Sequence, residues 1–445
     1  MVYWNLTYVV DTARAFSAYA ARWVWPSPDP WAIELLPKTY NERVEGKLEP
    51  RKRWLNLILR SSRSKWHLRV TFWGTIQDDQ KPISSKRPKR RKDLEDLCRC
   101  IDFQQIQLLY DTVTEVLLTR ERDCDTESSR LPCKTQPDSE SEYASVVGHL
   151  WVRTREDPLR LRFPVYEPDS GIPTKDLSEI EISEEDELDG GVYKVRLRGD
   201  EAVYVYKQVE RPHYVSGDSD VLEQELRNLG LFRGKNVGIV QLVAAITSTN
   251  PHQTVESKKD IGSAVLRGFL LEYHPNGTLQ DALKSTTPET DGQWRRWGLQ
   301  ITTALAHLHR CGITHMDLKP SNVVISASLD AVLIDVSGIG GVTRQWLSPE
   351  MLEGNDPLSR DTEPRMQNDI WALGQMLLAM ADMCCAKDEE QLLRSIALSA
   401  TRTPPRICLG DAITTLSGPP SHIIQNSSQS MSVGLNPPSV IPPVE

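Results

Sequence analysis

The chain has 445 residues, 39% hydrophobic and 25% charged, which is the composition of an ordinary soluble protein with room for two or three cores. Its net charge of -9 argues against a nucleic-acid binder that acts through overall charge, so no nucleic-acid partner is expected, although a local basic patch is not excluded. No run of about 20 apolar residues is present, so no membrane span is expected. Scattered cysteines favour a reducing compartment, and we expect a cytoplasmic protein.

Residues 1–135 form a tryptophan-rich region of unknown function, open to a regulatory, dimerising or partner-binding role. Its first 25 residues are apolar with interrupting charges and predict an amphipathic helix rather than a signal peptide. The stretch WHLRVTFWGTI alternates apolar and polar residues and predicts a half-buried strand. The stretch IDFQQIQLLYDTVTEVLLTR has apolar residues at helical spacing and predicts an amphipathic helix.

A basic run, Lys86–Lys92, separates these two stretches. It is open to two interpretations, a solvated linker or a nuclear-import or anion-binding patch, and the second makes the nucleus the alternative location. Residues 136–174 are expected to be a linker with a lead-in strand. Residues 418–445 are rich in Ser, Pro and Asn and are expected to be disordered.

Between these segments, residues 175–417 open with strand-like patterns and continue with helical ones. That order predicts a two-lobed α+β domain with a cleft between its lobes. At the seam lies ITHMDLKPSNVVI, in which Asp317, Lys319 and Asn322 precede a short apolar strand. Asp335 follows the next apolar run, and Mg²⁺ favours such carboxylate and amide oxygens together with phosphate.

Lys207 lies inside the apolar strand pattern AVYVYKQV, where a lysine needs a partner. The candidate partner is Glu225, on a predicted helix whose apolar face carries Leu222, Leu226 and Leu229. A lysine held by a glutamate in this way can contact two phosphates.

With these residues in order, 175–417 resembles a eukaryotic protein kinase domain. The motifs HMDLKPSN, DVSG, TRQWLSPE and DIWALG resemble the catalytic loop, the magnesium loop, the end of the activation segment and the following helix of that family. The resemblance implies an α+β bilobal fold, with a small β-rich N-lobe and a helical C-lobe, beside the additional N-terminal region. It also implies ATP, Mg²⁺ and protein substrates.

The resemblance implies a role for each matched residue. Asp317 would accept the proton of the substrate hydroxyl, Lys319 would contact the γ-phosphate, and Thr343 would be the substrate-loop threonine. Lys207 and Glu225 would pair, and Asn322 and Asp335 would bind the metal. The nucleotide would be bound by Gly190, Gly191, Val192, Val205, Lys207, Leu271, Glu272 and Tyr273. Asp369 would hold the catalytic loop, and Glu350 would form a buried pair with Arg406.

The chain departs from the family pattern at several places. Glu185 and Glu187 stand where the glycine loop has its first two glycines, or they lie outside a shortened loop in which Gly190 and Gly191 alone cover the nucleotide. In either case ATP affinity should be weaker than is usual for the family. Met316 replaces the arginine that receives an activation-loop phosphate, Val336 replaces the DFG phenylalanine, and Ser337 stands at the glycine. About 17 extra residues lengthen the loop around STNPHQTVESKKDIGSAV.

Three functions stay open on the sequence. The first is an active Ser/Thr protein kinase that needs no activation-loop phosphorylation, because all the polar side chains of phosphoryl transfer are present. The second is a pseudokinase that acts as a binding or scaffold module, suggested by the acidic glycine loop. The third is a kinase of a small molecule, which the protein-kinase type of the substrate-loop motifs disfavours.

Overall fold

The computed structural model describes residues 31–44, 48–76, 85–122, 128–168, 171–211, 214–255, 264–285, 292–354, 356–404 and 406–418. The chain divides into two compact units: unit 1 contains residues 1–160 with 251–261, and unit 2 contains residues 161–250 with 262–445. The helix expected at the N-terminus and the tail after residue 418 lie outside the described residues. Within the described ranges, no helix is both long and apolar enough to cross a membrane.

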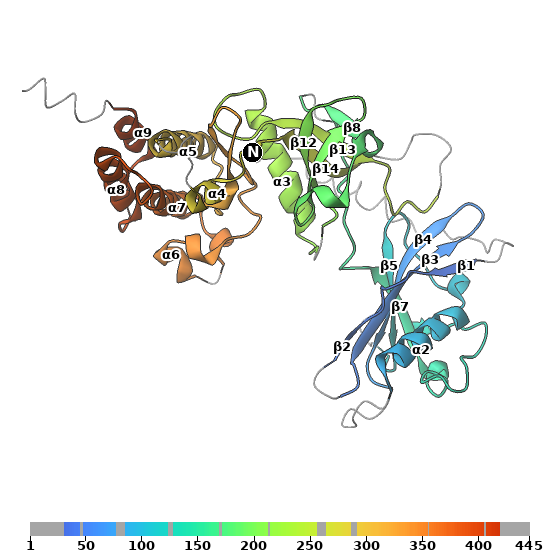
Figure 1. The fold of residues 1–445 in the computed structure, drawn as a ribbon. Helices are drawn as coiled ribbons and strands as arrows, with labels where there is room; N and C mark the ends of the chain where they lie inside the picture. Colours follow the sequence, from blue (N-terminus) through green and yellow to red (C-terminus); the bar gives the residue numbers. More distant parts are fainter. Residues whose placement is uncertain are drawn as a thin grey trace, which may run out of the picture. The chain divides into compact units, whose positions relative to one another are not determined.

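Unit 1 is built on one sheet with the strand order β1-β3-β4-β5-β7-β6, and β2 pairs with β3 (Figure 1). All its strand pairs are antiparallel except β4 and β5, which run parallel. A parallel pair needs a crossover, and helix α2 provides it between these two strands. The elements are β1 (Ala32–Leu35), β2 (Asn41–Arg43), β3 (Lys52–Arg60), β4 (Lys65–Trp73), α2 (Arg87–Cys100), β5 (Val113–Thr119), β6 (Ser129–Arg130) and β7 (Trp151–Glu156).

Alternation along β4 places its apolar side chains in the core of unit 1, as the sequence pattern predicted. Trp66, Leu68, Val70 and Phe72 are all at most 5% exposed. The same core contains apolar residues of α2, among them Leu94 and Leu97. A strand with one apolar face therefore fixes its own register, because a slip by one residue would expose this whole set.

Two predictions in unit 1 were wrong. Val113–Thr119, expected in a helix, is β5, whose five central residues are all buried. A strand covered on both faces shows no alternation, and the apolar residues Val113 and Leu117, four positions apart, imitated helical spacing. The basic run is not a linker, since from Arg87 it forms the first turns of α2. Its side chains are exposed, as expected, except that of Arg90, which is buried and pairs with Glu42 at 2.6 Å.

The end of unit 1 also differs from the expected boundary at residue 135. Strand β7 lies between β5 and β6 in the sheet, so residues 151–156 belong to unit 1 rather than to a linker. The long loop after β13 contributes residues 251–255 to the same unit, where Thr254 exchanges two hydrogen bonds with Asp111, each 2.8 Å long. The chain thus leaves unit 2 after β13, contributes this loop to unit 1, and then returns to unit 2.

Unit 2 begins with a mainly antiparallel sheet in the order β10-β11-β12-β14-β13-β8, with β9 paired to β11. Helix α3 packs against this sheet at β13 (Figure 1). The elements of this lobe are β8 (Thr174–Asp176), β9 (Ile180–Glu181), β10 (Glu187–Asp189), β11 (Val192–Leu197), β12 (Val203–Gln208), α3 (Asp218–Phe232), β13 (Leu242–Ser248) and β14 (Val265–Glu272). The predicted leucine face of α3 is confirmed, because Leu222, Leu226 and Leu229 are buried.

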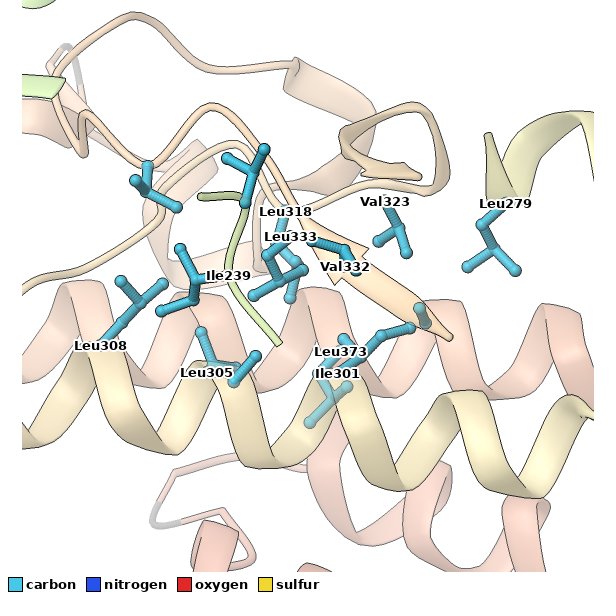
Figure 2. Close-up of a cluster of buried hydrophobic side chains, with 14 of the residues drawn as sticks. Ile239, Leu279, Ile301, Leu305, Leu308, Leu318, Val323, Val332, Leu333 and Leu373 are labelled. Atoms are coloured by element: carbon cyan, nitrogen blue, oxygen red, sulfur yellow. The ribbon is translucent and has the colours of Figure 1, made fainter. Parts of the chain in front are cut away.

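The second lobe of unit 2 is helical, and its helices α4 and α5 contact the small β15-β16 ribbon. Its elements are α4 (Leu279–Lys284), α5 (Trp294–Arg310), β15 (Val323–Ile325), β16 (Ala331–Leu333), α6 (Pro349–Leu352), α7 (Thr362–Ala381), α8 (Lys387–Thr401) and α9 (Leu409–Ser417). Ile301, Leu305 and Leu308 of α5 point toward the side of the helix on which Val332 and Leu333 of β16 lie (Figure 2). The cluster labelled there comprises Ile239, Leu279, Ile301, Leu305, Leu308, Leu318, Val323, Val332, Leu333 and Leu373. The loop before β15, through Leu318, and the loop after β16, through Val336, are therefore anchored in the same hydrophobic core.

Candidate active site

Lys207 lies between two carboxylates from distant parts of unit 2. Its Nζ is 2.7 Å from Oε2 of Glu225 on α3, and it also pairs with Oδ1 of Asp335 after β16. The Glu225 side chain is 1% exposed and that of Asp335 is 44% exposed. The structure thus brings these three residues together, with the aspartate on the accessible side.

The electrostatics of this cluster favour a charged lysine. Burial opposes the charge, but Asp335 and Glu225 outweigh it and raise the pKa of Lys207. Desolvation acts to raise the pKa of Asp335, yet the Lys207 ammonium prevails and lowers it. For Glu225 burial is the larger effect, and its pKa is raised above the ordinary value. The accessible carboxylate of Asp335 therefore remains the anion that can receive a cation.

The loop before β15 forms a second polar cluster around Asp317. Oδ2 of Asp317 accepts hydrogen bonds from Lys319 Nζ at 2.7 Å and Asn322 Nδ2 at 3.2 Å. Oδ1 accepts one from the main-chain nitrogen of Thr343 at 2.8 Å. Lys319 Nζ also donates to Thr343 Oγ1 at 2.8 Å. The segment around Thr343 is therefore attached to the loop that carries Asp317 and Lys319.

Buried contacts hold this loop in place. Asp369, on α7, accepts hydrogen bonds from the main-chain nitrogens of His315 at 2.7 Å and Met316 at 2.8 Å. Met316 has a φ of +64° and is 1% exposed. Its side chain packs with Leu347 and Met351 of the activation segment. An apolar contact therefore occupies the position where the related family has an arginine.

The residues expected around the adenine lie on three adjacent strands. Val192 on β11 pairs with Lys207 on β12, and Val205 on β12 pairs with Leu271 on β14. The side chain of Leu271 is 6% exposed and belongs to the lobe core. Glu272 accepts a hydrogen bond from the Gln241 nitrogen at 3.0 Å, and the Tyr273 ring lies 5.1 Å from Lys194 Nζ. The side chains of Leu271, Glu272 and Tyr273 thus each have a neighbour in the lobe.

The glycine turn is a short hairpin between β10 and β11, and its acids are part of it. The main-chain nitrogen of Gly190 donates to Asp189 Oδ1 at 2.8 Å, and that of Gly191 donates to Glu187 Oε1 at 3.2 Å. Gly191 has a φ of +84°, and a Cβ there would lie 2.5 Å from the Cβ of Arg211. Only glycine fits this position. Carboxylates hold the amides that a phosphate would use.

Glu350 and Arg406 form the expected ion pair, with 2.6 Å between Oε1 and Nη1. The arginine side chain is 1% exposed, whereas that of Glu350 is 36% exposed. The pair is therefore buried on one side only. Desolvation acts to raise the pKa of Glu350, but the hydrogen bond with Arg406 outweighs it, and the pKa is lowered.

Two polar residues near the cluster were missed on the sequence. Arg211 pairs with Asp218 at 2.6 Å, and this hydrogen bond, together with Asp335 and Glu225, raises the pKa of Arg211. Asn228 is 4% exposed on α3, one turn after Glu225. The sequence could have singled out Asn228, because it lies on the apolar face of a predicted helix, where a polar side chain needs a hydrogen-bond partner.

The donor set suits Mg²⁺ with a phosphate-bearing nucleotide. Asn322 Nδ2 donates to the main-chain oxygen of Asp317 at 2.9 Å, so its amide oxygen is the atom left for a cation. Together with the carboxylate of Asp335 it provides the hard oxygen ligands that Mg²⁺ prefers. Lys207, Lys319 and Arg211 bring positive charge to the same region. The acid-capped glycine turn opposes the phosphates, because Asp189 and Glu187 occupy its amides.

A sequence model of the protein kinase domain matches residues 189–403. The curated relatives that match the chain carry kinase names, and three of them illustrate the extent of the similarity. The serine/threonine-protein kinase SMU1 of Mycosarcoma maydis is 28% identical over 162 residues, which are 33% of this chain and 21% of that protein. Mitogen-activated protein kinase kinase kinase 17 of Arabidopsis thaliana is 31% identical over 131 residues, 28% of this chain and 35% of that protein. Mitogen-activated protein kinase kinase kinase 3 of Mus musculus is 28% identical over 137 residues, which are 27% of this chain and 21% of that protein. The chain thus covers about a third or less of these relatives.

Proposed function

Since the second unit belongs to the eukaryotic protein kinase-like family and has its bilobal fold, we propose that the protein transfers the γ-phosphate of ATP to Ser or Thr hydroxyls of protein substrates. The observation that carries the proposal is the convergence of Lys207, Glu225 and Asp335. In such transfers most of the rate comes from positioning and charge neutralisation, so these side chains matter more than the loops around them.

The polar residues have distinct roles in this proposal. Asp317 accepts the proton of the attacking hydroxyl, because its carboxylate is accessible and held in place by Lys319, Asn322 and Thr343. Lys319 adds positive charge beside the transferred group. Thr343 links Asp317 to the segment that would bind the substrate chain.

The nucleotide would be held by the first lobe. Lys207, fixed by Glu225, would contact its phosphates, and Asn322 and Asp335 would hold Mg²⁺. The bound ion neutralises charge on the phosphate oxygens. Protein substrates follow from the protein-kinase type of the activation segment, and unit 1 is the part of the chain left for a separate partner because none of these residues comes from it.

An assay on the intact protein tests the proposal directly. Purified chain, γ-labelled ATP and Mg²⁺ are incubated with basic and acidic Ser/Thr peptides, and autophosphorylation is followed in parallel. The matched variant Asp317→Asn should lose transfer but keep its ATP-Mg²⁺ thermal shift, since it preserves size and removes the proton acceptor. Lys207→Met should weaken both. An Asp317→Asn protein with wild-type turnover would refute the assignment of the base.

The second candidate, a pseudokinase, is favoured by one observation, the carboxylate-capped amides of the glycine turn. Phosphate oxygens would have to displace Asp189 and Glu187 or bind beside them. A wild-type protein that shows neither a thermal shift with ATP-Mg²⁺ nor any transfer supports this candidate. A shift together with transfer excludes it.

A further inference from the structure

The loop that carries Asp335 is attached to α3 by a side-chain amide. Asn228 Nδ2 donates hydrogen bonds to the main-chain oxygens of Val336 at 2.7 Å and Ser337 at 3.2 Å. Both carbonyls belong to the two residues directly after Asp335. The amide thus ties α3 to the segment that positions the metal-binding carboxylate.

The orientation of the Asn228 amide is itself fixed. Its Oδ1 accepts a hydrogen bond from Gln224 Nε2 at 2.9 Å, one turn earlier on α3. With oxygen and nitrogen both engaged and the side chain 4% exposed, the amide has one arrangement that satisfies its buried groups. A side chain of the same size without donors would leave two buried carbonyls unsatisfied.

A second contact supports the same attachment. Ser337 Oγ accepts a hydrogen bond from the main-chain nitrogen of Gly340 at 3.0 Å and closes a tight turn. A Cβ at Gly340 would lie 3.0 Å from Cγ1 of Val221, so this turn packs directly against α3. The loop after Asp335 therefore rests on the helix at Val221 and at Asn228, about two turns apart.

Val336 explains why an amide is needed here. It is fully buried but smaller than the phenylalanine of the DFG motif that this position resembles, so it offers less packing surface to α3. We propose that Asn228 is a positioning residue for Asp335. Its amide hydrogen bonds take the place of aromatic packing and keep the loop after Asp335 in one fixed position on α3. Glu225, three residues earlier on the same helix, is then brought to Lys207 by the same arrangement. This inference rests on the proposed function, because it assigns Asp335 to Mg²⁺.

Two variants and one control test the inference on the full chain. Asn228→Leu has a similar size but no donor, and Asn228→Asp keeps the shape but presents only acceptors to the carbonyls. Arg227→Gln changes the neighbouring residue on the exposed side of α3, where the arginine side chain is 63% exposed. The first measurement is amide hydrogen exchange of peptides covering residues 333–342 without nucleotide. Both Asn228 variants should exchange faster there, whereas Arg227→Gln and the peptides of α5 should not change.

The second measurement is the Mg²⁺ concentration at which ATP gives half of its maximal thermal shift. Loss of a hydrogen bond to a buried group should raise this concentration about tenfold in both Asn228 variants. Unchanged exchange in 333–342 together with unchanged Mg²⁺ dependence would overturn the inference. A wild-type protein that binds ATP-Mg²⁺ without transferring phosphate would end the proposed activity but leave this test intact. If the wild type shows no nucleotide shift at all, the exchange measurement alone decides.

Discussion

Asp369 Oδ1 lies 2.8 Å from the main-chain nitrogen of Met316, a residue held at a φ of +64°. A methionine is rarely found in this left-handed conformation, which persists only where neighbours impose it. Asp369 imposes it with two main-chain hydrogen bonds, and a third, from His309 Nε2 at 3.0 Å, fixes the carboxylate. The conformation of the loop that carries Asp317 thus depends on a fully buried acid of α7.

Asp369→Asn should destabilise this loop, because one amide hydrogen-bond donor then faces the donors of the main chain. We expect a loss of about 1–3 kcal/mol in the free energy of unfolding, measured in urea. We also expect a fall in kcat, since Asp317 loses its position. Asp382→Asn, an exposed change near the end of the same helix, serves as the control. Equal urea midpoints and equal kcat for Asp369→Asn and wild type would contradict this role.

Glu187→Gln should strengthen ATP binding. The Glu187 carboxylate accepts a hydrogen bond from the Gly191 amide and adds a negative charge at the glycine turn. Glutamine removes the charge, and its side-chain oxygen accepts the same hydrogen bond more weakly, so a phosphate displaces it more readily. A gain of about 1 kcal/mol corresponds to a fivefold lower Kd for ATP-Mg²⁺, measured by titration calorimetry. Glu185→Gln removes the same charge two residues earlier, where the carboxylate does not contact the Gly190 or Gly191 amide, and should have a smaller effect. Equal effects of the two changes would show that charge alone matters.

Glu350→Ala should lower the free energy of unfolding by about 1–3 kcal/mol, since it leaves the Arg406 guanidinium buried without its carboxylate. The loss is kept below that of a fully buried pair because Glu350 is partly exposed and solvent can replace it. Thermal melts of Glu350→Ala and of the nearby exposed change Glu353→Ala make the comparison. A Tm for Glu350→Ala equal to that of wild type would show that the pair contributes nothing.

His67 of unit 1 should make stability depend on pH. Burial, with smaller contributions from His252 and Lys65, lowers the pKa of His67 to about 4 from its ordinary 6.5. The unfolded chain therefore binds more protons than the folded one between these values. The contribution of neutral His67 is fully present above pH 6.5 and is lost as the pH falls toward 4.

His67→Phe keeps a ring beside His252, which lies 5.0 Å away, but cannot be protonated. Urea unfolding at pH 7.5, 5.5 and 4.5 should show a smaller loss for this variant than for wild type. The difference between the two proteins removes the contribution of the other titrating groups. Parallel pH profiles would exclude His67 as the source.

The sequence determined those features that depend on local pattern or on residue type. Alternation predicted β4, the leucine spacing predicted the buried face of α3, and the order of strands and helices predicted the two lobes of unit 2. The motif around Asp317 predicted which polar side chains would lie together, because the chemistry of phosphoryl transfer needs those residue types in that order. These inferences needed no knowledge of distant contacts.

Tertiary structure alone decided the rest. Strand β5 was mistaken for a helix because a strand buried on both faces has no alternating pattern, and its burial depends on the α2 crossover beside it. Residues 251–255 belong to unit 1 through contacts with residues far away in the chain, among them the hydrogen bonds of Thr254 with Asp111, 143 residues away, and with Lys65. The same holds for Asn228, whose partners lie 108 and 109 residues further along the chain. A side chain shows its type in the sequence, but the group that satisfies its hydrogen bonds is set by the folded chain.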